Sequence, residues 1–271
     1  MPELPEVETT MRALAARLRG RRVLRLERRT ARLREPLAVD LEQMVNGRRM
    51  VDFSRRAKYI LIHFDVPEIL LLHLGMSGRL LFDGPPQGRH EHLTFHCEGG
   101  TVLRFVDPRR FGMALLIAGS DPANHPRLAG LGVEPLSPEF DGEVLERLLR
   151  GRSCSIKAAL LDQRLVAGIG NIYACEALFR AGISPRRRAG NLGTRRCRRL
   201  ARAIREVLEE AIAAGGSSLR DYVGADGRIG NFQSDFRVYG REGEACPGCG
   251  DGVRRIVQGG RSTFFCGRCQ R

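Results

Sequence analysis

The chain has 271 residues, enough for one large domain or two modest ones with a hydrophobic core in each. It carries 45 Lys and Arg against 31 Asp and Glu, which gives a net charge of +14 and a pI near 10.4. This excess of positive charge indicates a polyanionic partner, with nucleic acid as the first candidate and an anionic membrane surface as the second. There is no run of 18 apolar residues and no signal-peptide pattern, so we expect a soluble, intracellular protein.

The first six residues combine a possible nucleophile with a carboxylate. If Met1 is removed, the chain starts with the secondary amine of Pro2, and an α-amino pKa near 8 leaves roughly a tenth of it unprotonated at neutral pH. Glu3 is one residue away and suits general acid or base catalysis. The alternative is a frayed terminus in which prolines precede a helix, and these six residues alone favour it.

The pattern of apolar residues predicts a helix followed by a set of strands. Residues 5–19 have a proline suited to a first helical turn and apolar residues on one face. Short apolar or alternating runs separated by Gly and Pro turns then predict an antiparallel β-sandwich or barrel. The expected strands are residues 23–27, 51–54, 59–64, 69–74, 79–82, 92–97, 102–106 and 113–117.

The second half of the chain has a helical pattern. It follows a stretch rich in Pro and Gly, residues 120–138, which is typical of a boundary between domains. A long polar stretch, residues 217–237, comes after the last helix, and a loop of this length is usually functional or mobile. The expected helices are residues 142–150, 156–162, 171–181 and 194–214.

Four cysteines near the C-terminus have the spacing of a zinc site. Two Cys-x2-Cys pairs are separated by sixteen residues, and four thiolates fill the tetrahedral shell of Zn2+ without leaving a position for substrate. The predicted zinc is therefore structural, and two disulfides are the less favoured alternative in an intracellular chain. We expect the residues between the pairs to form a β-hairpin that presents arginine to phosphates. The four predicted ligands are Cys246, Cys249, Cys266 and Cys269.

The other four cysteines have no metal-binding spacing. They are expected to be buried as small apolar side chains. These residues are Cys97, Cys154, Cys175 and Cys197.

Two further segments suggest contacts with nucleic acid. Residues 155–171 contain a glycine-bearing turn between two helices, with Lys157 and Asn171 placed to close on one phosphate, although glycine needed for tight packing explains the turn equally well. Residues 107–112 would expose Arg109 beside Phe111, as a wedge that unstacks bases or, alternatively, as the start of a strand. Met76 is either a core residue or a second apolar probe.

Lysine is rare in this chain. Only Lys58 and Lys157 among the 45 basic residues are lysines. A compact, titratable ammonium has uses that a permanently charged guanidinium does not, so these two positions are candidate functional sites. Chance is the alternative explanation.

Taken together, motifs spread along the whole chain resemble the bacterial formamidopyrimidine-DNA glycosylases. They are Met-Pro-Glu-Leu-Pro-Glu-Val-Glu-Thr at the start, Arg-Arg-Ala-Lys-Tyr around Lys58, His-Leu-Gly-Met-Ser-Gly, Asp-Pro-Arg-Arg-Phe-Gly, Gly-Ile-Gly-Asn-Ile-Tyr and the two cysteine pairs. The resemblance implies a bifunctional repair enzyme that removes oxidised purines, chiefly 8-oxoguanine and formamidopyrimidines, from double-stranded DNA. It then cuts the abasic strand by β,δ-elimination.

The resemblance also assigns roles to individual residues. Pro2 would attack the sugar C1′ and form a covalent iminium, and Glu3 would protonate the sugar ring oxygen. Lys58 would assist β-elimination, and Arg261 would bind phosphate and assist the second elimination. The implied DNA contacts are His90, Arg109, Arg152, Lys157, Asn171, Met76 and Phe111, and the one implied cofactor is the structural Zn2+. Among these, Met76, Arg109 and Phe111 would fill the hole left by the everted nucleotide.

An α+β, two-domain fold with a zinc finger follows from the same resemblance. It comprises an N-terminal helix and β-sandwich with the catalytic residues, residues 1–133, and a helix-two-turn-helix DNA-binding domain, residues 134–237. The latter includes a lesion-covering loop, residues 217–237, in which Arg220 stands where relatives can carry lysine. Residues 238–271 would be the zinc finger. The implied protein is a monomer in the bacterial cytoplasm, associated with the nucleoid.

Two other interpretations stay open. One is the related endonuclease branch acting on oxidised pyrimidines, which often has Gly at the position of Leu4; Leu4 itself, with the Met76, Arg109 and Phe111 set, favours the purine branch. The other is a DNA-binding zinc-ribbon protein without catalysis. The charge, the zinc site and the glycine turn suit that protein equally well, so only the chain start and Lys58 distinguish it from an enzyme.

Overall fold

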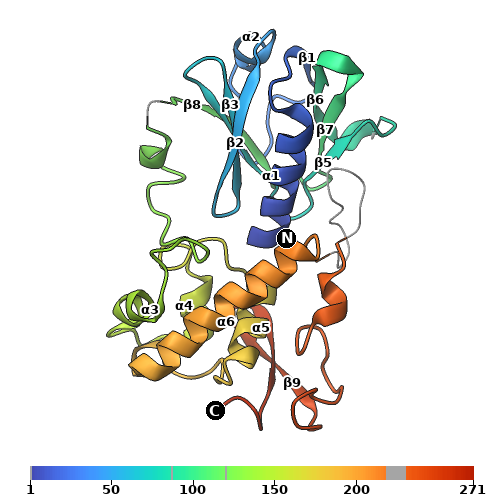
Figure 1. Ribbon diagram of the computed structural model, residues 1–271. Helices are drawn as coiled ribbons and strands as arrows, with labels where there is room; N and C mark the ends of the chain where they lie inside the picture. The colour runs from blue at the N-terminus through green and yellow to red at the C-terminus, as the bar shows by residue number, and fades with distance from the viewer. Residues whose placement is uncertain (1, 87, 120, 218–229) are drawn as a thin grey trace. The chain divides into compact units, whose positions relative to one another are not determined.

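The computed structural model describes residues 2–86, 88–119, 121–217 and 230–271. The chain divides into two compact units, drawn in Figure 1. Unit 1 consists of residues 1–129 and 214–231, and unit 2 of residues 130–213 and 232–271. The predicted lesion loop is therefore described only at its two ends, and Arg220 lies outside the described residues.

Unit 1 begins with helix α1, Leu4–Leu18, which confirms the predicted N-terminal helix to within one residue at each end. Glu3 is the N-cap and forms a reciprocal capping box with Glu6, so two backbone N–H groups at the helix start are satisfied. One face of α1 is buried, with Leu14 and Leu18 fully enclosed, and it packs against strand β2.

The rest of unit 1 is built mainly from two four-stranded antiparallel sheets. Their strand orders are β1-β6-β7-β5 and β2-β3-β4-β8. Side chains from both sheets and from α1 share one core, including Phe53, Ile62, Phe95 and Phe105. This arrangement confirms the predicted sandwich with a helix against it. The strands are β1 Val23–Arg28, β2 Met50–Arg56, β3 Tyr59–Phe64, β4 Ile69–His73, β5 Arg79–Phe82, β6 Glu91–Cys97, β7 Val102–Val106 and β8 Met113–Ile117.

Short helices fill some of the connections. The α-helix α2, Leu41–Val45, packs beside β1 and was not predicted, because five residues are too short to show a helical period. The single 3-10 turns are η1 Gly88–His90, η2 Glu98–Gly100, η3 Pro122–Asn124, η4 Ala189–Asn191 and η5 Phe232–Asp235.

Unit 2 contains the four predicted helices and the hairpin of the cysteine pairs. Helix α6 packs against both α3 and α5, and α5 packs against strand β10. No helix in the described part of the chain is long and apolar enough to cross a bilayer. The helices are α3 Gly142–Leu149, α4 Ile156–Leu161, α5 Asn171–Arg180 and α6 Thr194–Ala213.

The predicted hairpin between the cysteine pairs is formed by β9, Val253–Gln258, and β10, Arg261–Cys266. Gly259 and Gly260 connect the strands with φ angles of 54° and 72°. A two-residue turn with two positive φ angles matches the right-handed twist of the strands and favours glycine at both positions. The turn therefore holds Arg261 at the start of β10.

A buried carboxylate joins α5 to the segment that leads into the hairpin. Glu176 is 4% exposed and accepts hydrogen bonds from the backbone N–H groups of Arg237, Val238 and Tyr239, at 2.9, 3.0 and 2.8 Å. Burial raises the pKa of Glu176, while these three N–H groups oppose the shift by stabilising the charged form. This carboxylate therefore holds the segment that leads into the hairpin against α5.

We expect Glu176→Ala to lower the free energy of unfolding by roughly 3 kcal/mol, because it leaves buried N–H donors without an acceptor. The matched control is Glu210→Ala in α6, whose exposed ion pair with Arg180 is worth less than about 1 kcal/mol. Urea unfolding followed by circular dichroism measures both variants. Equal losses in the two variants would contradict the anchoring role of Glu176.

Candidate active site and nucleic-acid interface

Three predicted site segments leave the second sheet of unit 1 at the same end of its strands. Tyr59 of β3 pairs with His73 of β4, which pairs in turn with Met113 of β8. A row of paired residues brings its flanking segments together, although they are far apart in the sequence. The segments that adjoin this row are the turn with Lys58, the loop 74–78 and the loop 107–112.

Lys58 lies in the two-residue turn between β2 and β3. The preceding Ala57 has a φ of 53°, and Lys58 itself is 7% exposed. Arg55, two residues before the turn, donates from Nε to Oε2 of Glu8 in α1 at 2.6 Å. Burial raises the pKa of Glu8, but the hydrogen bonds and charges of Arg55 and Arg12 outweigh this and hold the pKa below its usual value. The Arg55 ion pair therefore fastens the Lys58 hairpin to the N-terminal helix.

The start of the chain is buried and hydrogen-bonded. Pro2 is buried and Glu3 is 3% exposed. Oε2 of Glu6 accepts the backbone N–H of Glu3 at 2.8 Å, and Oε1 accepts both the N–H and the hydroxyl of Ser217, at 2.8 and 2.9 Å. These contacts differ from those of a frayed terminus, and they hold Pro2 and Glu3 in a defined place.

His73 was not singled out from the sequence, and the structure places it beside Lys58. The centres of its ring and the Tyr59 ring are 4.9 Å apart, and its Nδ1 accepts the N–H of Gly75 at 3.0 Å. Burial, followed by the charges of Lys58 and Arg34, lowers the pKa of His73 to about 4. A neutral ring with Nδ1 as acceptor carries its proton on Nε2, so His73 offers one N–H donor beside Lys58. The motif His-Leu-Gly-Met-Ser-Gly contained this signal.

The two loops carry exposed apolar side chains. Met76 is 40% exposed and Phe111 is 42% exposed, so neither side chain is a core residue. The guanidinium of Arg109 lies over the Phe111 ring, 4.7 Å from its centre. His90 is half-buried at the end of η1, and its carbonyl accepts the N–H of Asp107, which brings it beside the second loop.

In unit 2, Lys157 and Asn171 converge on one carbonyl. Lys157 is fully buried, and its Nζ donates to Thr263 Oγ1 at 2.6 Å and to the Ser262 carbonyl at 3.2 Å. Nδ2 of Asn171 donates to the same carbonyl at 2.9 Å. Gln163 holds the glycine turn between their helices by accepting the N–H of Gly168 and donating to a carbonyl, both at 2.8 Å.

A hollow of about 300 Å3 lies beside this cluster. It is lined by Lys157, Arg261 and Gln258 among others, so it joins the hairpin turn to α4. Arg152 is half-buried just before α4, and its Nε donates to the carbonyl of Leu148 at 2.8 Å. The exposed guanidinium of Arg261 at this hollow suits a phosphate group, and the carboxylate of Asp162, which also lines it, is paired with Arg164 at 2.9 Å.

The four predicted metal ligands come together. The Sγ atoms of Cys246, Cys249, Cys266 and Cys269 all lie within 4.8 Å of one another. Backbone N–H groups of Gly248 and Cys269 donate to two of the sulfurs at 3.4 Å, as is favourable for thiolates. Four thiolates in this arrangement fit one tetrahedral Zn2+. The zinc site also forms part of a small core with Cys175.

The remaining cysteines are only partly as expected. Cys97, Cys175 and Cys197 are buried, but Cys154 is exposed, which corrects the prediction for that residue. Cys154 lies in the polar segment between Arg152 and α4, where the chain has no apolar face to place it in.

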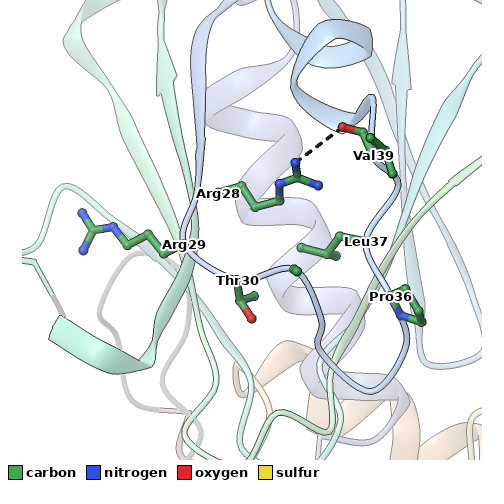
Figure 2. A pocket seen from close by; sticks show the side chains of 7 residues that line it. Arg28, Arg29, Thr30, Pro36, Leu37 and Val39 are labelled. Atoms are coloured by element: carbon green, nitrogen blue, oxygen red, sulfur yellow. Dashed lines mark hydrogen bonds between the residues drawn. The ribbon is translucent and has the colours of Figure 1, made fainter.

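A second hollow, of about 510 Å3, lies over the loop that follows β1 (Figure 2). Its two arginines already have partners: Arg28 binds Glu42 at 2.8 Å and the carbonyl of Ala38 at 2.8 Å, and Arg29 binds Glu91 at 3.4 Å. Figure 2 shows Arg28 directed toward Val39. Since these charges are neutralised by the protein itself, this hollow contributes no candidate site.

Three family models match the chain in succession. They are the formamidopyrimidine-DNA glycosylase N-terminal domain over residues 1–114, the H2TH domain of the same glycosylase over residues 131–223, and a zinc finger found in FPG and IleRS over residues 243–271.

Individual proteins match over their whole length. A formamidopyrimidine-DNA glycosylase of Paracoccus denitrificans is 53% identical, with all of both chains covered. The crystal structure of the MutM (FPG) protein of Thermus thermophilus is 45% identical, with a TM-score of 0.88 over 99% of this chain and 98% of that one. The wild-type Fpg (MutM) of Lactococcus lactis in complex with DNA that contains N7-benzyl-Fapy-dG is 34% identical, with a TM-score of 0.92 and complete coverage of both chains.

We expect the lowered pKa of His73 to make stability depend on pH. Between the unfolded pKa near 6.5 and the folded value of about 4, the unfolded chain binds a proton that the folded protein excludes. The free energy of unfolding should therefore fall by roughly 3 kcal/mol as pH drops through this window. Urea unfolding of the protein and of His73→Gln at pH 4 to 7.5 checks this. A difference between the two that does not vary with pH would refute the assignment.

Proposed function

Because the chain belongs to the formamidopyrimidine-DNA glycosylase family, we propose that it is a bifunctional DNA glycosylase and AP lyase. Its substrate is double-stranded DNA that contains oxidised purines, chiefly 8-oxoguanine and formamidopyrimidines. The observation that carries this proposal is the structure of the chain start, where Pro2 and Glu3 are buried and Glu6 accepts the N–H of Glu3. A DNA-binding protein without catalysis has no need of a fixed terminus.

The first step is base release by the secondary amine of Pro2, once Met1 has been removed. The amine attacks C1′ of the damaged nucleotide, and the bond from C1′ to the base breaks. Glu3 protonates the sugar ring oxygen, so the ring opens and an iminium forms between the Pro2 nitrogen and C1′. A nucleotide inside a duplex cannot be attacked in this way, so it has to leave the base stack first.

The second step is cleavage of the strand. Loss of a proton from C2′ of the iminium expels the 3′ phosphate in β-elimination, and a further elimination expels the 5′ phosphate. We assign Lys58 to the first elimination, because it adjoins the row of paired residues at the end of the sheet that also carries the two loops. We assign Arg261 to the phosphate of the second, because it lines the hollow beside Lys157.

The DNA contacts are shared by both units. Lys157, Asn171 and Arg152 of unit 2 are assigned to the phosphates that flank the lesion, which the hollow beside α4 supports. Met76, Arg109 and Phe111 of unit 1 are assigned to the space left by the everted nucleotide. His90 lies beside their loop and is assigned to the DNA backbone. The exposure of the two apolar side chains supports this role.

The proposal also covers the domain boundaries, the oligomeric state and the cellular location of the protein. The domain boundaries at residues 133 and 237, the lesion-covering role of residues 217–237 and a monomeric state all stay predictions. The net charge of +14 and the bacterial relatives favour an enzyme of the bacterial cytoplasm that associates with the nucleoid.

Borohydride trapping tests the catalytic proposal. We expect a covalent adduct between Met1-free protein and a duplex with 8-oxoguanine opposite cytosine, because reduction converts the iminium into a stable amine. Glu3→Gln should lose base release by at least about a hundredfold and keep DNA affinity. A protein carrying one additional N-terminal residue is the matched control, since its Pro2 nitrogen is inside a peptide bond. Intact mass confirms the terminus of each sample.

The outcomes separate the three interpretations. The absence of an adduct from Met1-free protein that binds the duplex would leave the non-catalytic DNA-binding protein. A stronger adduct with an oxidised pyrimidine than with 8-oxoguanine would favour the endonuclease branch. Normal turnover by Glu3→Gln would remove Glu3 from its role.

Removal of zinc should abolish DNA binding. The metal holds the hairpin that supplies Arg261 and the carbonyl contacted by Lys157, and metal binding and folding of such sites are coupled. We expect one zinc per chain by elemental analysis, and at least about a hundredfold weaker binding to a lesion duplex after chelation, measured by fluorescence anisotropy. Readdition of Zn2+ should restore binding. Unchanged affinity in a verified metal-free protein would contradict the structural role.

A further inference from the structure

The loops 74–78 and 107–112 share one buried carboxylate. Asp107, in the second loop, is fully buried. Its Oδ1 accepts a hydrogen bond from the hydroxyl of Ser77, in the first loop, at 2.7 Å. Its Oδ2 accepts the N–H of Gly112 at 2.7 Å, within its own loop. The N–H of Arg109 lies 3.3 Å from both Oδ1 of Asp107 and the Ser77 hydroxyl. One side chain thus determines the course of both loops.

The two loops also touch through their backbones. Gly75 has a φ of +65°, and a Cβ at that position would lie 2.5 Å from the carbonyl carbon of Phe111 and 2.6 Å from the nitrogen of Gly112. Side chains do not approach backbone this closely, so glycine is required at position 75. The first loop therefore cannot move far without moving the second.

The donors around Asp107 call for a carboxylate. A carboxylate presents only acceptors, and here a hydroxyl and two N–H groups are directed at its two oxygens. Hydrogen bonds to a charged acceptor are stronger than those between neutral groups, particularly where water is excluded. The carbonyl of Asp107 is also within 2.8 Å of Nε2 of the buried His92. Asp107 is thus fixed from both its side chain and its backbone.

From these contacts we infer that Asp107 is a positioning residue that joins the two loops into a single rigid probe. Met76, Arg109 and Phe111 then enter the base stack as one preformed unit instead of two independently ordered loops. Fixing a binding group in its bound shape before binding reduces the entropy lost on binding. The inference rests on the proposed function, since it names what positions the residues that fill the everted nucleotide's place.

The test uses Ser77, because Ser77→Ala removes the link between the loops and leaves the hydrogen bond from Gly112 to Asp107 in place. Ser77→Thr keeps the hydroxyl and serves as the conservative variant. Ser54→Ala is the matched control, since Ser54 donates or accepts a comparable hydrogen bond with His63 inside the second sheet, at 2.8 Å. Thermal unfolding establishes that each variant is folded.

The first measurement is amide hydrogen exchange in the free protein. Loss of the link should speed exchange at Arg109 and Gly112 by about tenfold in Ser77→Ala, although the substitution lies in the other loop. Ser77→Thr and Ser54→Ala should exchange there as the unaltered protein does. Asp107→Asn should also speed exchange at Gly112 or at Arg109, because the single amide oxygen can accept at only one of the two positions that Oδ1 and Oδ2 occupy. Unchanged exchange in Ser77→Ala would overturn the coupling, whatever is found with DNA.

The second measurement is insertion into DNA. A duplex with a stable abasic-site analogue and 2-aminopurine beside it reports unstacking by fluorescence. The unaltered protein and Ser77→Thr should give one insertion phase, and Ser77→Ala should give two phases or one at least about tenfold slower. An unaltered insertion phase in Ser77→Ala would overturn the inference. No fluorescence change with the unaltered protein would instead overturn the proposed function, which keeps the two failures distinct.

Discussion

The carboxylate of Glu6 is the contact on which the start of the chain depends. One of its oxygens accepts the N–H of Glu3, and the other accepts two hydrogen bonds from Ser217, which lies 211 residues further along the chain. Gly216 passes so close that a Cβ there would lie 3.2 Å from Glu6 Oε1. A terminal amine can act as a nucleophile only if the terminus has a fixed position, and chain ends are normally frayed. Glu6 supplies that fixed position by combining a capping box with a long-range contact.

In unit 2, a single backbone carbonyl positions two of the predicted DNA-binding side chains. The carbonyl of Ser262 accepts hydrogen bonds from both Lys157 and Asn171. Ser262 belongs to β10, whose end supplies the zinc ligand Cys266. A Zn2+ held by the four cysteines would be closed to substrate, but it would fix the strand that Lys157 and Asn171 contact.

The sequence predicted elements well where their signals are local. The bounds of β3, β5, β7 and β8 were expected residue for residue, because three of these short apolar runs end directly before an Asp and the fourth begins directly after Gly112. The zinc ligands were found because their spacing is itself the signal. The placement of His73 beside Lys58 and of Asp107 between two loops could not be predicted, because it depends on which strands pair and which loops then meet. The chemistry of Pro2 and Glu3 was suggested by the residues themselves, whereas their roles at the sugar and the full set of DNA contacts come from the resemblance, and all of these remain predictions.

The two lysines show how residue type and burial combine. Among the described residues, every arginine is half-buried or exposed, whereas Lys58 is 7% exposed and Lys157 is fully buried. A guanidinium has five N–H donors in a rigid plane and stays charged, so enclosing it requires acceptors on every side. An ammonium has three donors on a compact centre, and Lys157 directs Nζ to a hydroxyl and a carbonyl. In an enclosed site, three donors are easier to satisfy than five, and each unsatisfied donor is costly. The two lysines are thus more enclosed than any described arginine, and the two acceptors at Lys157 suit a compact ammonium.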